Sequence, residues 1–220
     1  MSENSKPTAA GKSEVINVPN MISASRLVLA IIIIALIPLG YYFAAMIVFV
    51  IAAGTDWVDG WWARKFDQVT QVGRILDSFC DKIIILGTFI LLAEAMVQVQ
   101  YDFPWYARVT GWMATVVFGR EMLVTALRSF IENAGGDFSA KMAGKIKFVL
   151  QCVAATVCLW ALSVKSGGQE ISSGLNAVLI GSVWLALIST IYSGAGYVNA
   201  AAKFIADANR SPESTESNDA

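Results

Sequence analysis

Six long apolar segments constrain this chain more than any other feature, because each is long enough to cross a lipid bilayer as a helix. They lie near 24–43, 44–65, 77–98, 106–131, 144–164 and 174–200. A bilayer core of about 30 Å needs roughly 20 apolar residues per helix. Only 15% of the residues are charged and 56% are hydrophobic, so a water-soluble domain is excluded. The sequence predicts an all-α integral membrane protein with six transmembrane helices.

The distribution of positive charge predicts the topology of these helices. If both termini are cytoplasmic, all of the 16 Lys and Arg residues except Arg108 and Lys165 lie inside or near inner helix ends. The aromatic segments 41–43 and 101–106 then lie at the outer interface. We therefore expect a multi-pass protein with both termini on the cytoplasmic side.

The two ends of the chain are polar and differ from the apolar middle. Residues 1–14 and 207–220 are predicted to be a disordered head and tail, flanking one six-helix domain at 15–206. The head has no apolar core followed by a cleavage site, so no cleaved secretory signal is expected. Pro19 and Asn20 favour the start of a short interfacial segment, from which Arg26 would reach lipid phosphate.

Residue usage excludes several kinds of chemistry. The chain has no histidine, which excludes a Ser/His or Cys/His pair and the usual imidazole metal ligands. Its three cysteines lie in apolar stretches without metal-ligand spacing, so we interpret them as packing residues without a disulfide framework. With a net charge of -1 and no basic stripe, the chain is not expected to bind nucleic acid.

Four aspartates stand at the inner ends of the second and third predicted helices. Asp56 and Asp59 are spaced i, i+3, and Asp77 and Asp81 are spaced i, i+4, so each pair shares one helix face. A turn of about a dozen residues between antiparallel helices lets both faces meet. Four clustered carboxylates repel one another and need positive charge, which Lys82 and Arg64 supply only in part. Oxygen ligands alone favour Mg²⁺ or Mn²⁺; the alternative is a salt-bridged helix pair without metal.

The aspartates belong to a longer pattern with fixed spacing. It reads D-x-x-D-G-x-x-A-R, eight residues, G, three residues, D, three residues, D, and is formed by Asp56, Asp59, Gly60, Ala63, Arg64, Gly73, Asp77 and Asp81. This pattern resembles the signature of the CDP-alcohol phosphotransferase family without a departure. The small residues within it let a nucleotide approach the backbone closely, although tight helix packing explains each of them equally well.

The resemblance implies an activity and a set of roles. An alcohol attacks the phosphoryl group attached to diacylglycerol in a CDP-linked lipid, and CMP leaves. The four aspartates hold metal, two Mg²⁺ or Mn²⁺ ions, and Asp81 also acts as general base. The residues expected to bind the CDP-lipid are Asp59, Gly60, Ala63, Arg64 and Gly73. The family also implies a homodimer.

Four cations point to the second substrate. Arg120 and Arg128 lie on the fourth predicted helix, and Lys145 and Lys147 open the fifth. Together they favour an acceptor with a phosphate group, although lysines at 145 and 147 are also typical of a positive inner loop. This part of the chain is similar to the bacterial phosphatidylglycerophosphate synthase branch of the family, which has R-E, A-L-R and G-K-x-K with a nearby Q. The similarity implies glycerol 3-phosphate as the acceptor. It also implies a bacterial inner membrane, with the active site facing the cytoplasm.

Other functions stay open at this point. Inositol phosphate, serine or phosphatidylglycerol would serve as acceptors in the same chemistry. Outside the enzyme class, acids within the membrane are also typical of a cation transporter. A transporter needs polar residues along a whole path, however, and the fifth and sixth segments read as almost uniformly apolar.

Overall fold

The computed structural model describes residues 18–66, 71–98, 103–134 and 142–210, with side chains described over 25–55, 79–98, 103–134 and 142–207. These residues form six α-helices, no strand and the short 3-10 helix η2 (Trp105–Ala107). The helices are α1 (Val18–Leu36), α2 (Tyr42–Phe66), α3 (Gln71–Ala95), α4 (Gly111–Asn133), α5 (Met142–Ser166) and α6 (Ser173–Arg210). The prediction of an all-α protein with six long helices is confirmed.

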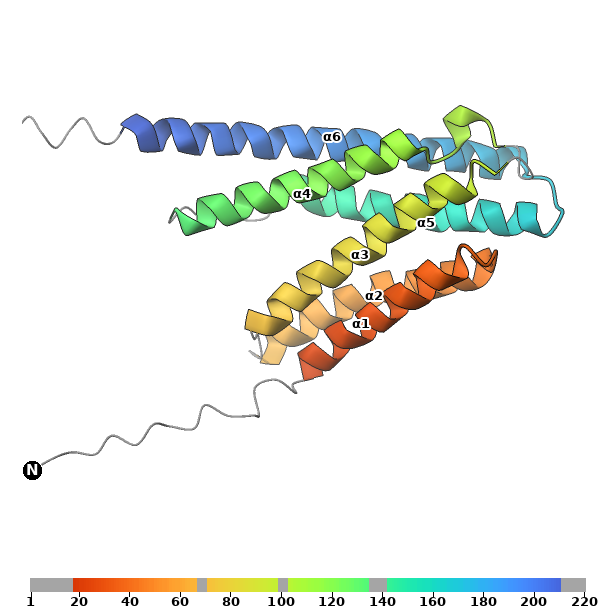
Figure 1. Ribbon diagram of the computed structural model, residues 1–220, viewed down its shortest axis with the longest axis horizontal. Coiled ribbons are helices and arrows are strands. Elements are labelled where there is room, and N and C mark those ends of the chain that lie inside the picture. The colour runs from red at the N-terminus through yellow and green to blue at the C-terminus, as the bar shows by residue number, and fades with distance from the viewer. Residues whose placement is uncertain (1–17, 67–70, 99–102, 135–141, 211–220) are drawn as a thin grey trace, which may run out of the picture.

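The helices run up and down in an antiparallel bundle (Figure 1). The connections that follow α1, α3 and α5 lie at one end, whereas the start of α1 and the end of α6 lie at the other. Helices α1 to α3 form one group and α4 to α6 a second, and the groups spread apart toward the end that carries the two termini (Figure 1). Helix α5 joins them because it packs against α2, α3 and α6.

Prolines and glycines explain the helix boundaries at the opposite end. Pro38 follows the last residues of α1, and Gly40 has a φ of 79°, a left-handed conformation that glycine adopts without a steric cost. Gly168, with a φ of 73°, has the same role after α5. Pro104 precedes η2, and Thr110, in an extended conformation, occupies the position before the first residue of α4. Helix α4 therefore begins at Gly111 and not near residue 106 as predicted.

The two outer helices differ from their predicted bounds. Helix α1 is continuous from Val18, so the expected interfacial segment at Pro19 and Asn20 forms its first turns and is not a separate element. Helix α6 has 38 residues and continues to Arg210, four residues into the segment predicted as a tail. At 1.5 Å per residue it is about 57 Å long, which exceeds the thickness of a bilayer core.

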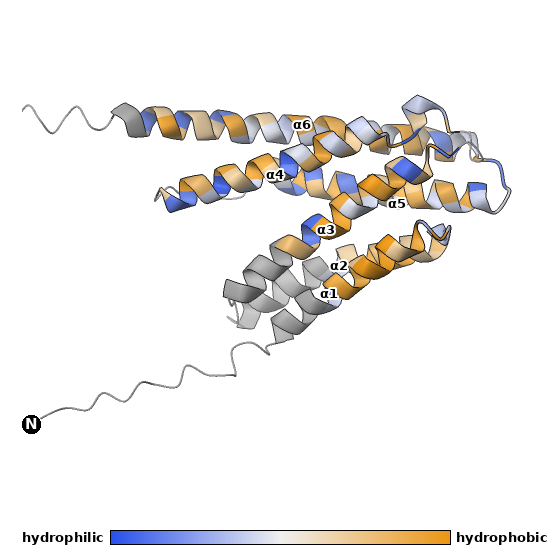
Figure 2. Cartoon of the chain, in the orientation of Figure 1, coloured by the Kyte–Doolittle hydropathy of each residue, from blue (hydrophilic) through white to orange (hydrophobic). Residues whose placement is uncertain are grey.

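Hydrophobic residues make up much of the described helices (Figure 2), and many of them are exposed. Large hydrophobic side chains such as Ile31, Val149 and Ile188 are more than half exposed. Within the described residues, Met142–Ser166 and Ser173–Asp207 are long and apolar enough to span a membrane, and Ser25–Leu36 and Tyr42–Thr55 are shorter apolar helices. Such a surface suits lipid on the outside.

Small residues allow close packing inside the bundle. Ala154, Ala155 and Ala186 are completely buried where α5 and α6 run side by side. None of the three cysteines forms a disulfide; Cys80 and Cys158 are buried and Cys152 is partly buried. This confirms their interpretation as packing residues.

Candidate functional site

The predicted site residues are divided between the described and undescribed parts of the chain. Asp56 and Asp59 belong to the C-terminal part of α2, and Asp77 and Asp81 belong to the N-terminal part of α3. Of these four side chains, the structure describes that of Asp81. The side chains of the remaining signature positions, Asp56, Asp59, Gly60, Ala63, Arg64, Gly73 and Asp77, lie outside the described residues. Among the side chains that are described, no cluster of three or more potential metal ligands occurs, so the four-aspartate site stays a prediction.

Asp81 forms an ion pair with an arginine from the first helix. Arg26 of α1 donates a hydrogen bond from Nη2 to Oδ1 of Asp81, and the Arg26 side chain is only 1% exposed. The expectation that Arg26 reaches outward to lipid phosphate is therefore wrong, because its side chain points into the bundle. The contact fixes the orientation of the Asp81 carboxylate and ties α1 to α3.

The sequence does contain a signal for this pairing. Arg26 is in register with Ala30, Ile33 and Ile37, at i+4, i+7 and i+11, and all four residues are buried. An arginine on the buried face of an apolar helix needs an anionic partner. Arg26 is therefore a cation at Asp81 that was not predicted from the sequence, from which Lys82 and Arg64 were named.

A second polar cluster joins α4 to α5. Arg120 donates from Nη1 to Oε1 of Glu121 over 3.0 Å, and Lys147 Nζ donates to the same oxygen. The side chains of Arg120 and Lys147 are 9% and 5% exposed. Two buried cations therefore share one carboxylate, and the cluster carries a net positive charge.

Helix α6 contributes polar side chains that were not predicted from the sequence. Ser193 accepts a hydrogen bond of 2.6 Å from Nη2 of Arg120, and the Tyr197 ring lies 5.3 Å from the guanidinium carbon. One turn away, Gln151 of α5 donates to Thr190 of α6 over 2.9 Å. The expectation that these two helices are almost uniformly apolar is wrong on their facing sides. The spacing of Thr190, Ser193 and Tyr197, i, i+3, i+7, is the signal that could have identified the polar face.

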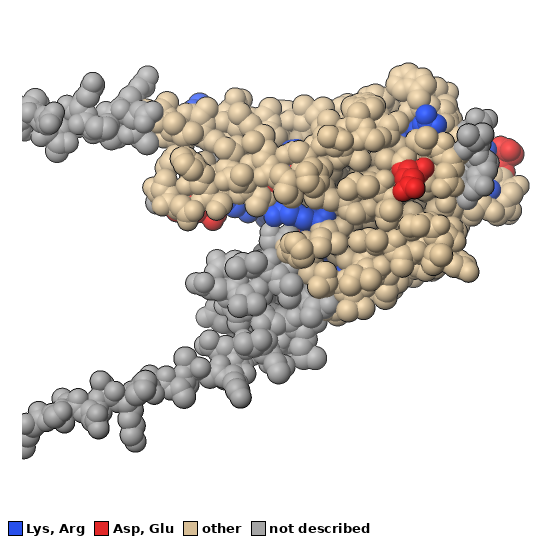
Figure 3. All heavy atoms as spheres, viewed as in Figure 1, with Lys and Arg blue, Asp and Glu red and all other residues tan. Residues whose placement is uncertain are grey.

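The two other predicted acceptor residues lie in different surroundings. Arg128 is partly buried on α4, seven residues after Glu121 and hence on the same face, and its Nε has no hydrogen-bond partner among the described residues. Lys145 is exposed on α5. Lys and Arg atoms gather along the edge of the α4 layer that looks toward α1 to α3 (Figure 3). Arg120 and Lys147 are thus brought together, Arg128 follows them along α4, and Lys145 remains at the surface.

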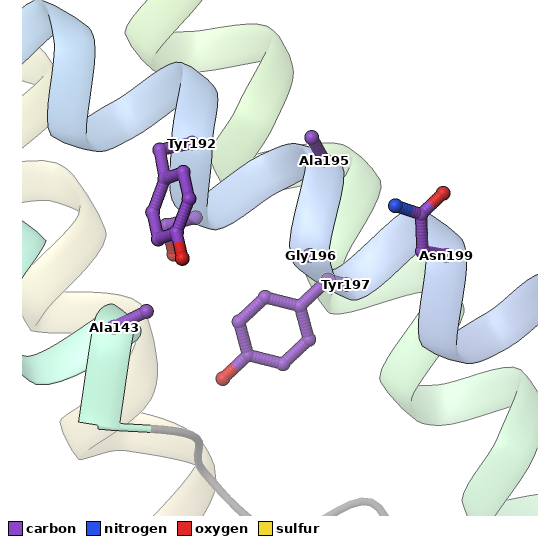
Figure 4. A pocket seen from close by; sticks show the side chains of 7 residues that line it. Ala143, Tyr192, Ala195, Gly196, Tyr197 and Asn199 are labelled. Carbon is purple, nitrogen blue, oxygen red and sulfur yellow. The ribbon is translucent and has the colours of Figure 1, made fainter.

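A pocket of about 370 Å³ lies beside this cluster. Its lining residues come from the first turn of α5 and from α6: Ala143, Tyr192, Ser193, Ala195, Gly196, Tyr197 and Asn199. Tyr192 and Tyr197 extend from α6 toward the start of α5, where Ala143 lies (Figure 4). Ser193 and Tyr197 therefore contact Arg120 and also line the pocket.

The similarity of this chain to known proteins covers the region in which these site residues lie. The family model for CDP-alcohol phosphatidyltransferase matches residues 16–193, a segment that includes all four aspartates and the cluster of α4 and α5. A protein from Bacillus subtilis (strain 168) is 34% identical over 196 residues, covering 82% of this chain and 93% of its own length. One from Pectobacterium atrosepticum is 28% identical over 190 residues, covering 84% of this chain and 94% of its own.

A third relative, from Escherichia coli (strain K12), is 32% identical over 149 residues, which cover 66% of this chain and 77% of that protein. Each of the three is named CDP-diacylglycerol--glycerol-3-phosphate 3-phosphatidyltransferase. The family match extends over most of the chain, including the whole region in which the sequence pattern and the polar clusters occur. The chain therefore belongs to the CDP-alcohol phosphatidyltransferase family.

Proposed function

We propose that this chain transfers the phosphatidyl group of CDP-diacylglycerol to glycerol 3-phosphate, giving phosphatidylglycerol phosphate and CMP. The observation that carries the proposal is the similarity to relatives named for this reaction, two of which align with more than four-fifths of the chain. The family match replaces the cation transporter as an explanation for the acids in the bundle.

The cluster of α4 and α5 supports an acceptor that carries negative charge. Arg120 and Lys147 have one carboxylate between them, that of Glu121, so an anion would balance the remaining charge. Arg120 also has a buried Nε without a hydrogen-bond partner among the described residues. A phosphate group offers several acceptor oxygens to such donors. Arg120, Arg128, Lys145 and Lys147 are the residues we propose for binding the phosphate of glycerol 3-phosphate.

The residues of the signature fit a hard divalent cation. Asp56, Asp59, Asp77 and Asp81 offer only oxygen atoms, and a chain without histidine has no imidazole to compete. We propose that they hold two Mg²⁺ or Mn²⁺ ions. Such ions supply charge neutralisation at the pyrophosphate when bound.

The remaining roles belong to the side chains themselves. Asp81 would accept the proton of the glycerol 3-phosphate hydroxyl as that oxygen attacks phosphorus, and its ion pair with Arg26 keeps the carboxylate in a fixed orientation. Gly60, Ala63 and Gly73 would leave room for the nucleotide, together with Asp59 and Arg64 as CDP-lipid contacts. CMP then leaves as the new phosphodiester forms.

The apolar surface supports a multi-pass arrangement in a bacterial inner membrane. We propose that both termini and the active site face the cytoplasm, because the end of the bundle that carries the termini also carries the signature aspartates and most of the positive charge. The family resemblance supports a homodimer surrounded by membrane lipid.

The acceptor is tested by offering several alcohols to the purified chain. CDP-diacylglycerol is supplied with labelled glycerol 3-phosphate, inositol phosphate, serine or phosphatidylglycerol in parallel, and CMP and lipid products are measured. We expect label to enter lipid with glycerol 3-phosphate far faster than with the other alcohols. Faster transfer to any of the others would reassign the acceptor, and absence of CMP release with all of them would overturn the proposed reaction.

Replacing Arg128 by alanine is expected to raise the KM for glycerol 3-phosphate about tenfold, because one charge-assisted hydrogen bond to phosphate is lost. The KM for CDP-diacylglycerol should change less than about twofold. Steady-state kinetics on both substrates checks this, with Lys203→Ala as a control that removes an exposed cation from α6. An equal rise in both KM values would remove Arg128 from the acceptor site.

A further inference from the structure

The face of α6 that meets α4 and α5 carries buried polar side chains. Thr190, Ser193 and Tyr197 follow one another at i, i+3 and i+7, and they are 0%, 1% and 3% exposed. At helix interfaces in a membrane bundle, Ser and Thr allow close packing and also hydrogen-bond across helices. These polar side chains contact residues of the neighbouring helices, and both Ser193 and Tyr197 contact Arg120.

Three groups hold the Arg120 guanidinium from different sides. Ser193 Oγ accepts from Nη2 at 2.6 Å, and Glu121 Oε1 accepts from Nη1 at 3.0 Å. The Tyr197 ring covers one face, with its centroid 5.3 Å from the guanidinium carbon, within the range of a cation–π contact. Because both terminal nitrogens and one face are engaged, the plane of the guanidinium has little freedom to rotate.

Two glycines make this arrangement possible. A Cβ atom at Gly194 would lie 3.2 Å from Cγ of Arg120, and one at Gly144 would lie 3.2 Å from Oη of Tyr197. Both distances are shorter than ordinary van der Waals contact, so a methyl group at either position would require the arginine or the tyrosine to shift by a few tenths of an ångström. At Gly181, also on α6, a Cβ atom would meet nothing within 4 Å. The close approach is thus specific to the part of α6 that faces Arg120.

One hydrogen-bond donor of the Arg120 guanidinium is not used by these contacts. Its Nε is buried and has no hydrogen-bond partner among the described residues. Two of the residues that hold this guanidinium, Ser193 and Tyr197, also line the pocket described above. A fixed guanidinium with an unused donor, in a cluster of net positive charge, is arranged to receive an anionic group at low entropic cost.

We infer that Ser193 and Tyr197 are positioning residues that fix the Arg120 side chain so that it can bind the phosphate of the acceptor. Glycine at positions 144 and 194 leaves the space that the side chains of Tyr197 and Arg120 occupy. The inference rests on the proposed function, in which Arg120 binds glycerol 3-phosphate. It adds α6 to the acceptor site, which the sequence pattern had confined to the fourth and fifth helices.

The test compares the KM values of the two substrates in variants of α6. Ser193→Ala should raise the KM for glycerol 3-phosphate about tenfold, since it removes a hydrogen bond to a charged group. Tyr197→Leu should raise it about fivefold, and Tyr197→Phe, which keeps the ring, should recover most of that effect. The KM for CDP-diacylglycerol should stay within about twofold in each variant, a selectivity that a general loss of structure would not produce.

Glycine variants and a double mutant make the test independent of any single substitution. Gly194→Ala should reproduce the rise in KM for glycerol 3-phosphate, whereas Gly181→Ala should have no effect. In an Arg120→Ala background, Ser193→Ala should raise that KM less than about twofold further, because the residue it positions is gone. If Tyr197→Leu does not fold, Ser193→Ala and Gly194→Ala decide the outcome.

The possible failures are distinguishable. Wild-type protein that releases no CMP in response to glycerol 3-phosphate would overturn the proposed function. Wild-type protein that uses glycerol 3-phosphate, together with variants whose two KM values are unchanged or rise equally, would overturn the positioning role alone. Additive effects of Ser193→Ala and Arg120→Ala would contradict it as well.

Discussion

Replacing Asp81 by asparagine is expected to abolish turnover while leaving nucleotide binding largely intact. Asparagine has nearly the same shape and still accepts a hydrogen bond from Arg26, so the contact between α1 and α3 is retained. It cannot take up the proton of the attacking hydroxyl. Loss of a general base typically costs about 100-fold to 10,000-fold in rate, and we expect a fall in this range in the kcat for CMP release.

The control for Asp81 is a second acid on the same helix. Glu94 is exposed near the opposite end of α3, and Glu94→Gln should leave CMP release unchanged. Binding of CDP-diacylglycerol to the Asp81 variant is measured by titration, and thermal unfolding shows whether the fold is retained. Normal CMP release by the Asp81→Asn protein would remove Asp81 from the role of base.

Replacing Glu121 by glutamine should have the largest effect on stability. Glutamine still accepts a hydrogen bond from Arg120 or Lys147, but it leaves two buried cations without a negative charge between them. Breaking a buried ion pair by neutralising one partner costs about 3 kcal/mol or more. We therefore expect a clear fall in the free energy of unfolding and in the midpoint of thermal unfolding in detergent.

A matched control for Glu121 lies on the same helix. Glu132 is exposed near the end of α4, so Glu132→Gln removes the same charge without breaking a buried cluster. Its unfolding midpoint should equal that of the wild type, and Glu121→Asp should recover part of the loss by restoring the carboxylate. A Glu121→Gln protein as stable as the wild type would show that another group neutralises Arg120 and Lys147.

The fold was predictable because the length and spacing of apolar segments determine how many helices the chain forms. The residues at which the helices end were harder to predict, because they depend on individual residues such as proline and glycine. Pro38 and Gly40 end the first helix at residue 36, although the apolar run continues to residue 43. Polarity was also an unreliable guide at the C-terminus, where α6 continues through residues 207–210 that were predicted as part of a tail.

The candidate site was predictable where residues fall in a fixed pattern, and less so where partners come from distant segments. The eight-position pattern that contains the aspartates resembles the family signature, and the family match confirms that resemblance. The contact of Arg26 with Asp81 joins residues 55 positions apart, and that of Arg120 with Ser193 joins residues 73 apart. Neither pairing has a local spacing rule, because each arises from how whole helices pack. Buried polar residues on apolar helices were the available sign, and Ser193 and Tyr197 were overlooked in the apolar run of α6.

The proposed mechanism depends on clustered aspartates that use divalent cations to transfer a phosphatidyl group to glycerol 3-phosphate. CMP release from CDP-diacylglycerol is measured with and without glycerol 3-phosphate, first in excess chelator and then after magnesium or manganese is added back. We predict that release depends on glycerol 3-phosphate, is lost in chelator and returns with either added metal. Release that depends on glycerol 3-phosphate but continues at full rate in rigorously metal-free solution would contradict this mechanism.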